Sequence, residues 1–326
     1  MNRDYKELRD PETRGQLKNN ETELIREDGK VYPILKNIPR FVKGENYSED
    51  FGKQWQIFPG TQLDSVSGLS ITEDRIARCL NGNLIKIKGK KVLEAGSGAG
   101  RFSEILLKHG ALLHSFDYSN AVEVNAQNNN INENFILVQA DIRQIPFDIE
   151  SYDYVICLGV LQHTPSPEES IECLWEMVKP GGYLVIDHYP WKWRIVLPTP
   201  VGEALSLYRY IILRIDKKNR FKFVKNLVDF WFPIHWTFRK SKWMQRILRR
   251  LSPVIFHYPD INLKNKERYY EWSLLDTHDG TTDFFKHRRT VKEIRNILEK
   301  IGAIEIKIEK GGNGIEAFCR KPIKKD

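Results

Sequence analysis

The sequence is poor in cysteine and has no long uninterrupted run of apolar residues. Its four cysteines, Cys79, Cys157, Cys173 and Cys319, form no CxxC pair and show no other spacing typical of a zinc site or a disulfide framework. No apolar run approaches the ~20 residues that cross a bilayer. The charged N-terminus also lacks the apolar segment of a secretory signal. We therefore expect a cytoplasmic protein with reduced thiols and no bound metal.

Positive charge is concentrated in one segment of the chain. The formal net charge is +8, yet residues 191–255 alone contain fifteen Lys or Arg and only three Asp or Glu. The rest of the chain is therefore net acidic by about four charges. The basic segment needs an explanation separate from that of the main domain.

From Lys90 onward, apolar strand patterns alternate with helical patterns, and this alternation resumes near Thr290. The predicted strands are 91–95, 111–117, 135–141, 152–159, 182–187, 303–310 and 314–322. The predicted helices are 101–109, a helix that begins at Ser119, 168–178 and 291–302. Residues 179–182 are predicted to close the helix 168–178. Such alternation indicates a parallel sheet covered by helices on both faces, which is a doubly wound α/β fold.

The alternation is interrupted for about a hundred residues after Asp187, directly after the carboxyl end of a strand. Doubly wound sheets bind ligands at that edge, so an insertion there can form a substrate pocket. We predict four segments: an N-terminal extension with a lid helix (1–60), the first part of the core (61–189), a helical basic and aromatic cap (190–285) and the last helix and two strands of the core (286–326).

An aromatic row in the N-terminal extension has the spacing of one helical face. It consists of Tyr47, Phe51, Trp55 and Phe58, three and four residues apart. The row predicts a helix that either docks on the main domain or covers the cofactor. In the second case Trp55 is a candidate cofactor contact.

A glycine-rich turn follows the first strand of the core, in the sequence VLEAGSGAGRF. Glycine suits a tight turn whose backbone passes close to a ligand and whose following helix packs closely on the strand. The candidate cofactor-binding residues of this loop are Gly96, Ser97, Gly98 and Gly100. A plain strand-to-helix turn is the alternative for such a triplet on its own.

Two carboxylates favour an adenosyl methyl donor over a dinucleotide. Asp117 ends the next strand, where a carboxylate can accept hydrogen bonds from both ribose hydroxyls, and Tyr118 adjoins it. The spacing is GxGxG rather than GxGxxG, and Glu94 stands two positions before the first glycine. We expect Glu94 to face the cationic methionine end of S-adenosylmethionine.

The next two strands supply further candidate contacts at their carboxyl ends. Asp141 can accept a hydrogen bond from the adenine amino group while Ile142 covers the ring, although Asp141 could equally cap a helix. Leu158 and Gly159 follow the fourth strand and allow close approach of the cofactor. His163 then faces the predicted transfer site.

The motifs EAGSGAGRF, SFDYS, QADIRQIPF, DYVICLGVLQHTPSP and MVKPGGYLVI resemble class I methyltransferases of the UbiE/methyltransferase-11 type over residues 90–188. This resemblance implies S-adenosylmethionine as cofactor and a Rossmann-like seven-stranded sheet whose last strand is antiparallel. Segments outside the sheet resemble bacterial methyltransferases encoded with glycan-biosynthesis genes. REDGKVYPILKNIPRFV further resembles half of a zinc-ribbon-derived domain, but no cysteine precedes Cys79, so we expect it to bind no zinc.

The candidate catalytic base is His163, because methyl transfer needs a base only when the acceptor must lose a proton. A histidine that anchors the loop is the alternative for this position. A second polar group, Asp276, His278, Asp279 and His287, suggests substrate recognition, with His278 and Asp279 as further catalytic candidates. Metal binding by these residues is disfavoured because their spacing matches no familiar site.

The basic segment, residues 191–258, has three interpretations. It can be a helical cap whose Lys and Arg side chains reach solvent, a surface for an anionic membrane or lipid-linked acceptor, or a surface for nucleic acid. We expect a small-molecule or lipid-linked acceptor, with a sugar derivative favoured by the resemblance. An RNA methyltransferase and a non-catalytic adenosyl-binding partner protein are the alternatives.

Overall fold

The computed structural model describes residues 5–42, 48–191, 204–258 and 260–323. The chain divides into two compact units. The first consists of Met1–Glu49, Ser70–Pro190 and Phe285–Asp326, and the second of Asp50–Leu69 and Trp191–Phe284.

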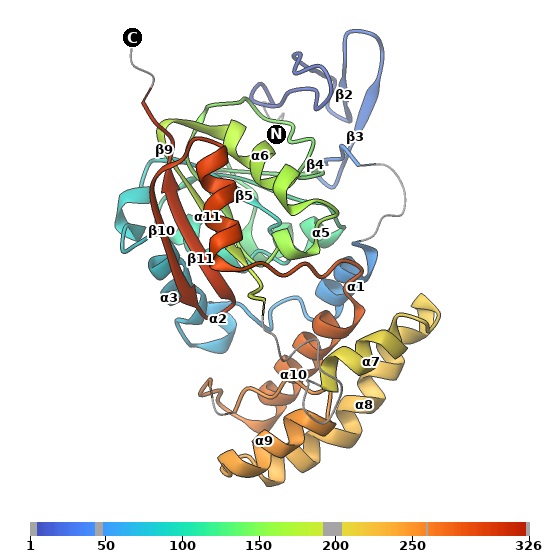
Figure 1. The fold of residues 1–326 in the computed structure, drawn as a ribbon. Coiled ribbons are helices and arrows are strands. Elements are labelled where there is room, and N and C mark those ends of the chain that lie inside the picture. The colour runs from blue at the N-terminus through green and yellow to red at the C-terminus, as the bar shows by residue number, and fades with distance from the viewer. Residues whose placement is uncertain (1–4, 43–47, 192–203, 259, 324–326) are drawn as a thin grey trace. The chain divides into compact units, whose positions relative to one another are not determined.

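The first unit is built on a seven-stranded sheet with the order β10-β11-β9-β8-β5-β6-β7 (Figure 1). In this sheet β11 runs in the direction opposite to that of the other six strands. The strands are β5 (Lys91–Ala95), β6 (Leu112–Asp117), β7 (Phe135–Gln139), β8 (Tyr152–Cys157), β9 (Val178–His188), β10 (Ile304–Gly311) and β11 (Gly314–Arg320). The predicted fold class is confirmed. One detail differs, because residues 178–182 begin β9 rather than close the preceding helix.

Helices cover both faces of this sheet because neighbouring strand residues point to opposite sides. In β5, Val92 and Leu93 lie in different cores. The Leu93 core contains α6 (Pro167–Met177) and α11 (Val291–Lys300), whereas the Val92 core contains α3 (Ile71–Cys79), α4 (Arg101–Lys108) and Val122 of α5 (Ala121–Asn129). Short 3-10 turns, η1 (Leu84–Ile87) and η2 (Leu161–His163), complete the unit.

The N-terminal residues of the first unit form a small antiparallel sheet beside the β7 edge of the main sheet. Its strands are β1 (Lys18–Asn19), β2 (Glu23–Ile25), β3 (Val31–Leu35) and β4 (Ile38–Pro39). Arg40 continues β4 as a parallel bridge to Gln139. The Phe41 amide donates to the Gln139 carbonyl at 2.8 Å. This contact covers an edge strand that would otherwise expose unpaired backbone groups.

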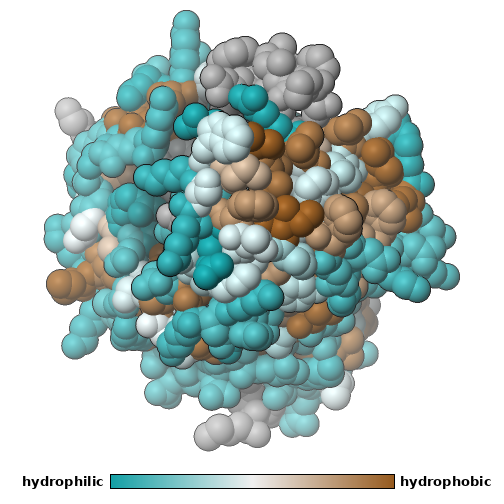
Figure 2. Space-filling model, turned by 90° about the horizontal axis from the view of Figure 1, so that it is seen from below, coloured by the Kyte–Doolittle hydropathy of each residue, from teal (hydrophilic) through white to brown (hydrophobic). Residues whose placement is uncertain are grey.

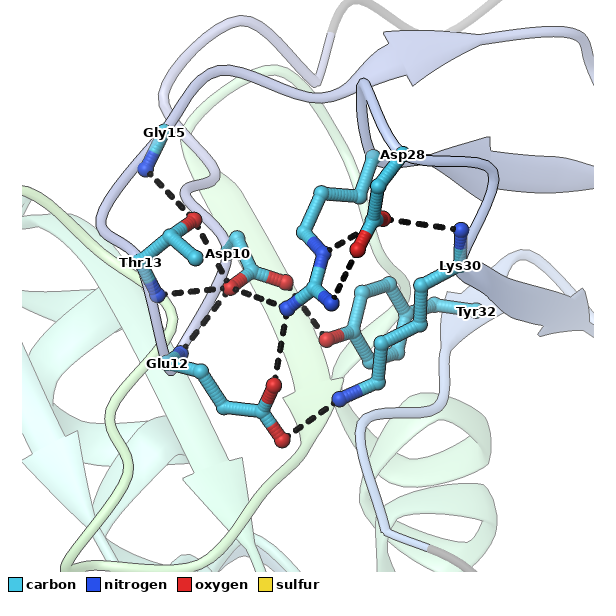
Figure 3. Close-up of polar contacts among 8 residues, drawn as sticks. Asp10, Glu12, Thr13, Gly15, Asp28, Lys30 and Tyr32 are labelled. Carbon is cyan, nitrogen blue, oxygen red and sulfur yellow. Dashed lines mark hydrogen bonds and ion pairs between the residues drawn. The ribbon is translucent and has the colours of Figure 1, made fainter.

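A buried carboxylate organises this small sheet (Figure 3). The Asp10 side chain is fully buried and accepts hydrogen bonds from the backbone amides of Glu12 and Thr13, the Thr13 hydroxyl and the Tyr32 hydroxyl. Arg26 adds an ion pair at 3.3 Å. Burial alone would raise the pKa of Asp10, but these hydrogen bonds hold its pKa well below the usual value. The predicted absence of zinc here remains a prediction.

The second unit is helical. It contains α1 (Glu49–Ile57), α2 (Asp64–Ser67), α7 (Ala204–Ile212), α8 (Lys217–Thr237), α9 (Lys242–Leu251) and α10 (Lys266–Thr282). Helix α10 packs against α7 and α8, and α7 also contacts α9. No helix in the described part of the chain is long and apolar enough to cross a membrane.

The division of the chain differs from the predicted segment boundaries. Residues 50–69, predicted as part of the extension and of the core, group with the insertion. The reason is packing between distant residues: the rings of Phe58 and Phe221 lie 6.3 Å apart, and the Trp272 indole donates to the Thr61 carbonyl at 2.9 Å. Of the predicted aromatic row, Tyr47 lies outside the described residues.

Candidate functional site

The glycine-rich loop joins β5 to α4 in a backbone conformation that L side chains rarely adopt. Gly96, Gly98 and Gly100 have φ values of 76°, 51° and 87°. A Cβ on Gly96 would lie 2.2 Å from a methyl group of Val160, and one on Gly100 would lie 2.2 Å from the Asn125 side-chain oxygen. These two positions therefore need glycine for both conformation and space.

Two buried polar atoms at the loop have no hydrogen-bond partner among the described residues. The buried Glu94 carboxylate accepts hydrogen bonds from Ser103 and Ser115, both at 2.6 Å and both to Oε2, whereas Oε1 has no partner. The Ser97 hydroxyl is also buried and unpartnered. Native proteins satisfy almost all buried polar atoms, so these two atoms are candidate contacts for a bound ligand. Glu94 and Ser97 thus fit a polar, cationic methionine group.

The protonation of Glu94 responds to its surroundings. Burial raises the pKa of Glu94 to about 7, against the hydrogen bonds from Ser103 and Ser115, which lower it. A nearby positive charge would stabilise the ionised form and lower this pKa. The side chain is therefore suited to a cationic ligand near neutral pH.

Asp117 holds the loop from the end of β6. Its Oδ2 accepts the Gly98 amide at 2.8 Å, and its Oδ1 accepts the Ser119 amide and hydroxyl at 2.8 and 2.7 Å. Burial raises the pKa of Asp117. Oδ1 already accepts two hydrogen bonds, whereas Oδ2 accepts one and keeps a lone pair for a ribose hydroxyl. The predicted ribose role of Asp117 stays a prediction.

The predicted adenine contacts are engaged within the protein. Asp141 forms an ion pair with Arg143 at 2.8 Å and begins a turn rather than a helix, so the helix-cap alternative does not hold. Ile142 is buried in the main core. Tyr118 is half-buried, and its carbonyl accepts the Gln139 side-chain amide at 3.0 Å. Adenine binding by these residues is untested.

The carboxyl ends of β8 and β9 meet at Gly159 and Asp187. The Gly159 amide donates to the buried Asp187 carboxylate at 2.6 Å, and Arg75 of α3 forms an ion pair with the other carboxylate oxygen. Gly159 has a φ of 78°, and a Cβ built there would meet no atom of the described residues within 4 Å, its two chain neighbours apart. Leu158, by contrast, is buried in the second core. Open space beside Gly159 is thus available for a ligand.

His163 lies in η2, close to this space in the sequence, and is buried. Its Nδ1 lies 3.2 Å from the Phe285 carbonyl oxygen, and its ring meets Tyr189 edge-on at 5.4 Å. A carbonyl can only accept a hydrogen bond, so Nδ1 carries the proton in the neutral ring. Nε2 then carries the lone pair that a base requires.

Three other side chains of the first unit carry buried polar atoms that lack a hydrogen-bond partner within the described part of the chain. Neither side-chain atom of Gln162 has a hydrogen-bond partner among the described residues, nor do the Nε2 atoms of His188 and His287. Backbone contacts join the segments that contain these residues. The His287 amide donates to the Gln162 carbonyl at 2.9 Å, and Pro190 forms an isolated parallel β-bridge with Arg289. We call Gln162, His163, His188 and His287 the crown cluster.

The predicted second polar group is divided by the structure. Asp276, His278 and Asp279 lie in α10 of the second unit, whereas His287 belongs to the first. Asp276 and His278 also point to different sides of α10, because residues two apart do not share a helical face. Asp276 pairs with His257 at 2.7 Å, and His278 lies 2.7 Å from the Gln54 amide oxygen. Asp276 and His278 therefore do not act from one face of α10, and substrate recognition by this group stays a prediction.

Three of the predicted functional residues lie in the second unit. They are Trp55, which is half-buried in α1, and His278 and Asp279 in α10. Burial lowers the pKa of His278 to about 4. The His278 ring is therefore neutral at physiological pH. Its side chain is buried within the helical unit.

Sequence reasoning missed Arg75, whereas Gln162 and His188 follow strand ends that it placed near the transfer site. Arg75 stands in a helix that precedes the glycine-rich loop, and only the fold brings it to Asp187. The signal for the cluster lies in the spacing of the strand ends. Gln162 follows β8 and His188 ends β9, and adjacent parallel strands place their carboxyl ends together.

Comparison with known proteins agrees with this geometry. Residues 93–186 match the methyltransferase domain family, from within β5 to within β9. This part of the chain is therefore similar to a methyltransferase domain, which agrees with the predicted enzyme class and with S-adenosylmethionine as the predicted cofactor.

Curated relatives match the same part of the chain. A ubiquinone biosynthesis O-methyltransferase of Coxiella burnetii is 33% identical over 122 residues, which cover 36% of this chain and 51% of the relative. One from Pseudomonas putida is 36% identical over 104 residues, covering 30% of this chain and 44% of the relative. The chain thus spans about half the length of the curated relatives that it matches.

Solved structures show a distant likeness. Human N-acetylserotonin methyltransferase has a TM-score of 0.45 at 14% identity, covering 83% of this chain and 56% of that one. Haemonchus contortus phosphoethanolamine N-methyltransferase 2 has a TM-score of 0.45 at 15% identity, covering 83% and 47%. The fold assignment therefore rests on the observed strand order and on the domain match.

Proposed function

We propose that this protein transfers the methyl group of S-adenosylmethionine to a hydroxyl group of a small or lipid-linked acceptor. The observation that carries the proposal is the crown cluster at the carboxyl ends of β8 and β9. Gln162, His188 and His287 carry buried side-chain atoms without hydrogen-bond partners in the described part of the chain, and Gln162 follows Gly159 closely in the sequence. Leaving such atoms unpaired costs about 1–3 kcal/mol each, so a polar acceptor that pairs with them gains affinity there.

S-adenosylmethionine supplies a methyl group activated by a positively charged sulfur. The residues that would hold it are Glu94 and Ser97, through their orphan oxygens, the loop glycines and Asp117. Positioning the reactants and excluding water supply most of the acceleration in such a displacement. The chain's main task is therefore orientation rather than covalent catalysis.

His163 is the group that we assign to proton removal. A hydroxyl acceptor must lose its proton as the carbon–oxygen bond forms, and a neutral imidazole with its proton on Nδ1 can take that proton on Nε2. Hydrogen bonding of Nδ1 to the Phe285 carbonyl holds the ring in that tautomer. Gln162, His188 and His287 then contact the polar groups of the acceptor.

The acceptor class is inferred from chemistry and from the relatives. The curated relatives are named as O-methyltransferases, which supports an oxygen acceptor. A ring hydroxyl of a lipid-linked metabolite and a hydroxyl of a sugar derivative in glycan assembly both satisfy the crown cluster. The sugar derivative comes from the sequence resemblance alone.

Transfer of a labelled methyl group tests this proposal. The purified protein is incubated with methyl-labelled S-adenosylmethionine and a lysate fractionated into lipids, small molecules, RNA and protein. We expect label in the lipid or small-molecule fraction, in a form that survives as a methyl ether. Gln162→Leu should abolish transfer and keep donor binding, whereas the exposed control Gln127→Leu should leave both unchanged. Label confined to RNA or protein would contradict the proposed acceptor.

Methylation of RNA is the second candidate function. The observation in its favour is the basic character of the second unit, because cations that contact phosphates give affinity without sequence specificity. It predicts label in the RNA fraction and donor-dependent binding that weakens steeply with salt. A non-catalytic adenosyl-binding partner protein predicts donor binding with label in no fraction.

A further inference from the structure

Exposed aromatic side chains in the described part of the chain all belong to the second unit. Among the described residues with more than about a third of their surface exposed, the aromatic ones are Trp191, Tyr210, Phe223, Phe230, Phe238, Trp243 and Phe284. Figure 2 shows apolar side chains gathered to the right of centre, on the side where Figure 1 draws α7 and α8. Scattered apolar residues are ordinary on a surface, but concentrated aromatic ones mark an interaction site.

Helix α8 carries the longest part of this surface. Phe223, Leu227, Phe230 and Ile234 recur at spacings of four, three and four, which is one helical face. Phe223 is 37% exposed and Phe230 is 64% exposed. The interior of the unit is filled by a different face, on which Val224 and its neighbours along the helix are buried. The exposed stripe is therefore additional to the core-facing stripe.

The neighbouring helices add similar groups. On α7, Leu207, Tyr210 and Ile211 are 48%, 60% and 45% exposed and share one face. The Arg214 guanidinium lies 3.3 Å from the centre of the Tyr210 ring. On α9, Trp243 is 66% exposed. Tyrosine and tryptophan with an apolar body and a polar tip are enriched where a surface meets both hydrocarbon and water.

The same three helices are strongly basic. Residues 204–251 contain thirteen Lys or Arg and two Asp. Arg246, Arg249 and Arg250 are exposed on α9, and Lys218 and Lys222 are exposed at the start of α8. Cations beside apolar aromatic groups match the two components of an anionic bilayer surface, which are charged headgroups above hydrocarbon.

We propose that α7, α8 and α9 form a docking surface for an anionic lipid bilayer, which we call the membrane face. Its occupant is lipid rather than a second copy of this chain because two such surfaces of like charge would repel each other. The protein would lie on the bilayer and not span it, since no described helix is suited to crossing. A bilayer-bound enzyme meets an acceptor with a lipid tail directly at its source.

Vesicle co-sedimentation of the full chain tests the membrane face. One set of vesicles is phosphatidylcholine alone, and the other contains about a third phosphatidylglycerol. We expect binding to the anionic set, weakening as salt rises. Replacing Arg246, Arg249 and Arg250 with serine should lower the partition coefficient about fivefold per arginine at low salt. The same replacement at the exposed Lys86, Lys88 and Lys90 of the first unit is the charge-matched control and should have little effect.

The apolar part of the membrane face has its own variant. Phe230→Ser combined with Trp243→Ser should weaken binding to anionic vesicles at least tenfold. Ile85→Ser, which changes an 83% exposed apolar residue of the first unit, is the control and should leave binding unchanged. Far-ultraviolet circular dichroism checks that each variant is folded.

Three results would overturn the membrane face. The first is equal binding to neutral and anionic vesicles, and the second is an equal loss of binding in the control variants. The third is absence of vesicle binding together with tight binding to RNA or with concentration-dependent dimerisation. The inference goes beyond the proposed function and fails separately from it. Donor binding and methyl transfer to an acceptor in detergent do not depend on vesicles, so loss of vesicle binding alone leaves the proposed function intact.

Discussion

Replacing Glu94 with glutamine removes a buried ionisable group and keeps the shape of its side chain. In the folded protein, burial raises the pKa of Glu94 to about 7, from a reference of 4.5. A raised pKa means that the folded state holds this proton more tightly than the unfolded state. The stabilisation is therefore complete below about pH 4.5 and is lost as the pH rises through 7.

The magnitude follows from the size of the shift. Each pKa unit corresponds to 1.36 kcal/mol, so a shift of this size amounts to on the order of 3 kcal/mol. The substituted glutamine side chain cannot ionise and carries no such dependence. We expect the difference in unfolding free energy, Glu94→Gln minus wild type, to become more positive by up to about 3 kcal/mol between pH 5 and pH 8.

Urea denaturation of both proteins at pH 5, 6, 7 and 8 measures this difference. Glu133→Gln, at an exposed position, is the matched control and should parallel the wild type at every pH. Comparing variants cancels the contributions of other titrating groups, such as His114, whose pKa burial lowers to about 4. Parallel pH profiles for wild type and Glu94→Gln would refute the reasoning about Glu94.

The remaining predictions concern the donor, the small sheet and metals. Asp117→Ala should weaken S-adenosylmethionine binding by about 1.5–3 kcal/mol by calorimetry, the range for a hydrogen bond to a charged group, and nicotinamide dinucleotides should not compete. Asp10→Ala should lower the free energy of unfolding by about 3 kcal/mol, because it leaves Arg26 and the Tyr32 hydroxyl without their buried partner. A decrease of less than about 0.5 kcal/mol would contradict the role of Asp10 in organising the small sheet. Elemental analysis of protein purified without chelators should find no stoichiometric metal, and one equivalent of zinc would contradict this.

The core fold could be predicted because its signals are local. The apolar strands, the glycine loop and the helices between them follow one another along the chain, and handedness rules restrict how they assemble. The positions of Gly96 and Asp117 at strand ends followed directly. The grouping of residues 50–69 with the insertion could not be predicted, because it depends on contacts such as Phe58 with Phe221, which are far apart in the sequence.

The candidate site could be predicted only in part. Proximity in sequence suggested one group from Asp276 to His287, but a helix end and a unit boundary separate these residues. Conversely, Gln162 and His287 are distant in sequence and joined by a backbone hydrogen bond at 2.9 Å. Gln162 and His287 meet because the chain after β8 and the segment that returns from the insertion run together, which is a property of the topology rather than of any motif.

Isothermal titration of the purified chain with S-adenosylmethionine tests the central claim most directly. The account predicts binding in the micromolar range by the wild type, and loss of binding in Gly98→Arg, since a side chain at that left-handed glycine fills the space between loop and ligand. Circular dichroism confirms that the variant is folded. Absence of binding by the folded wild-type protein would contradict the assignment of the loop, and with it the proposed methyltransferase activity.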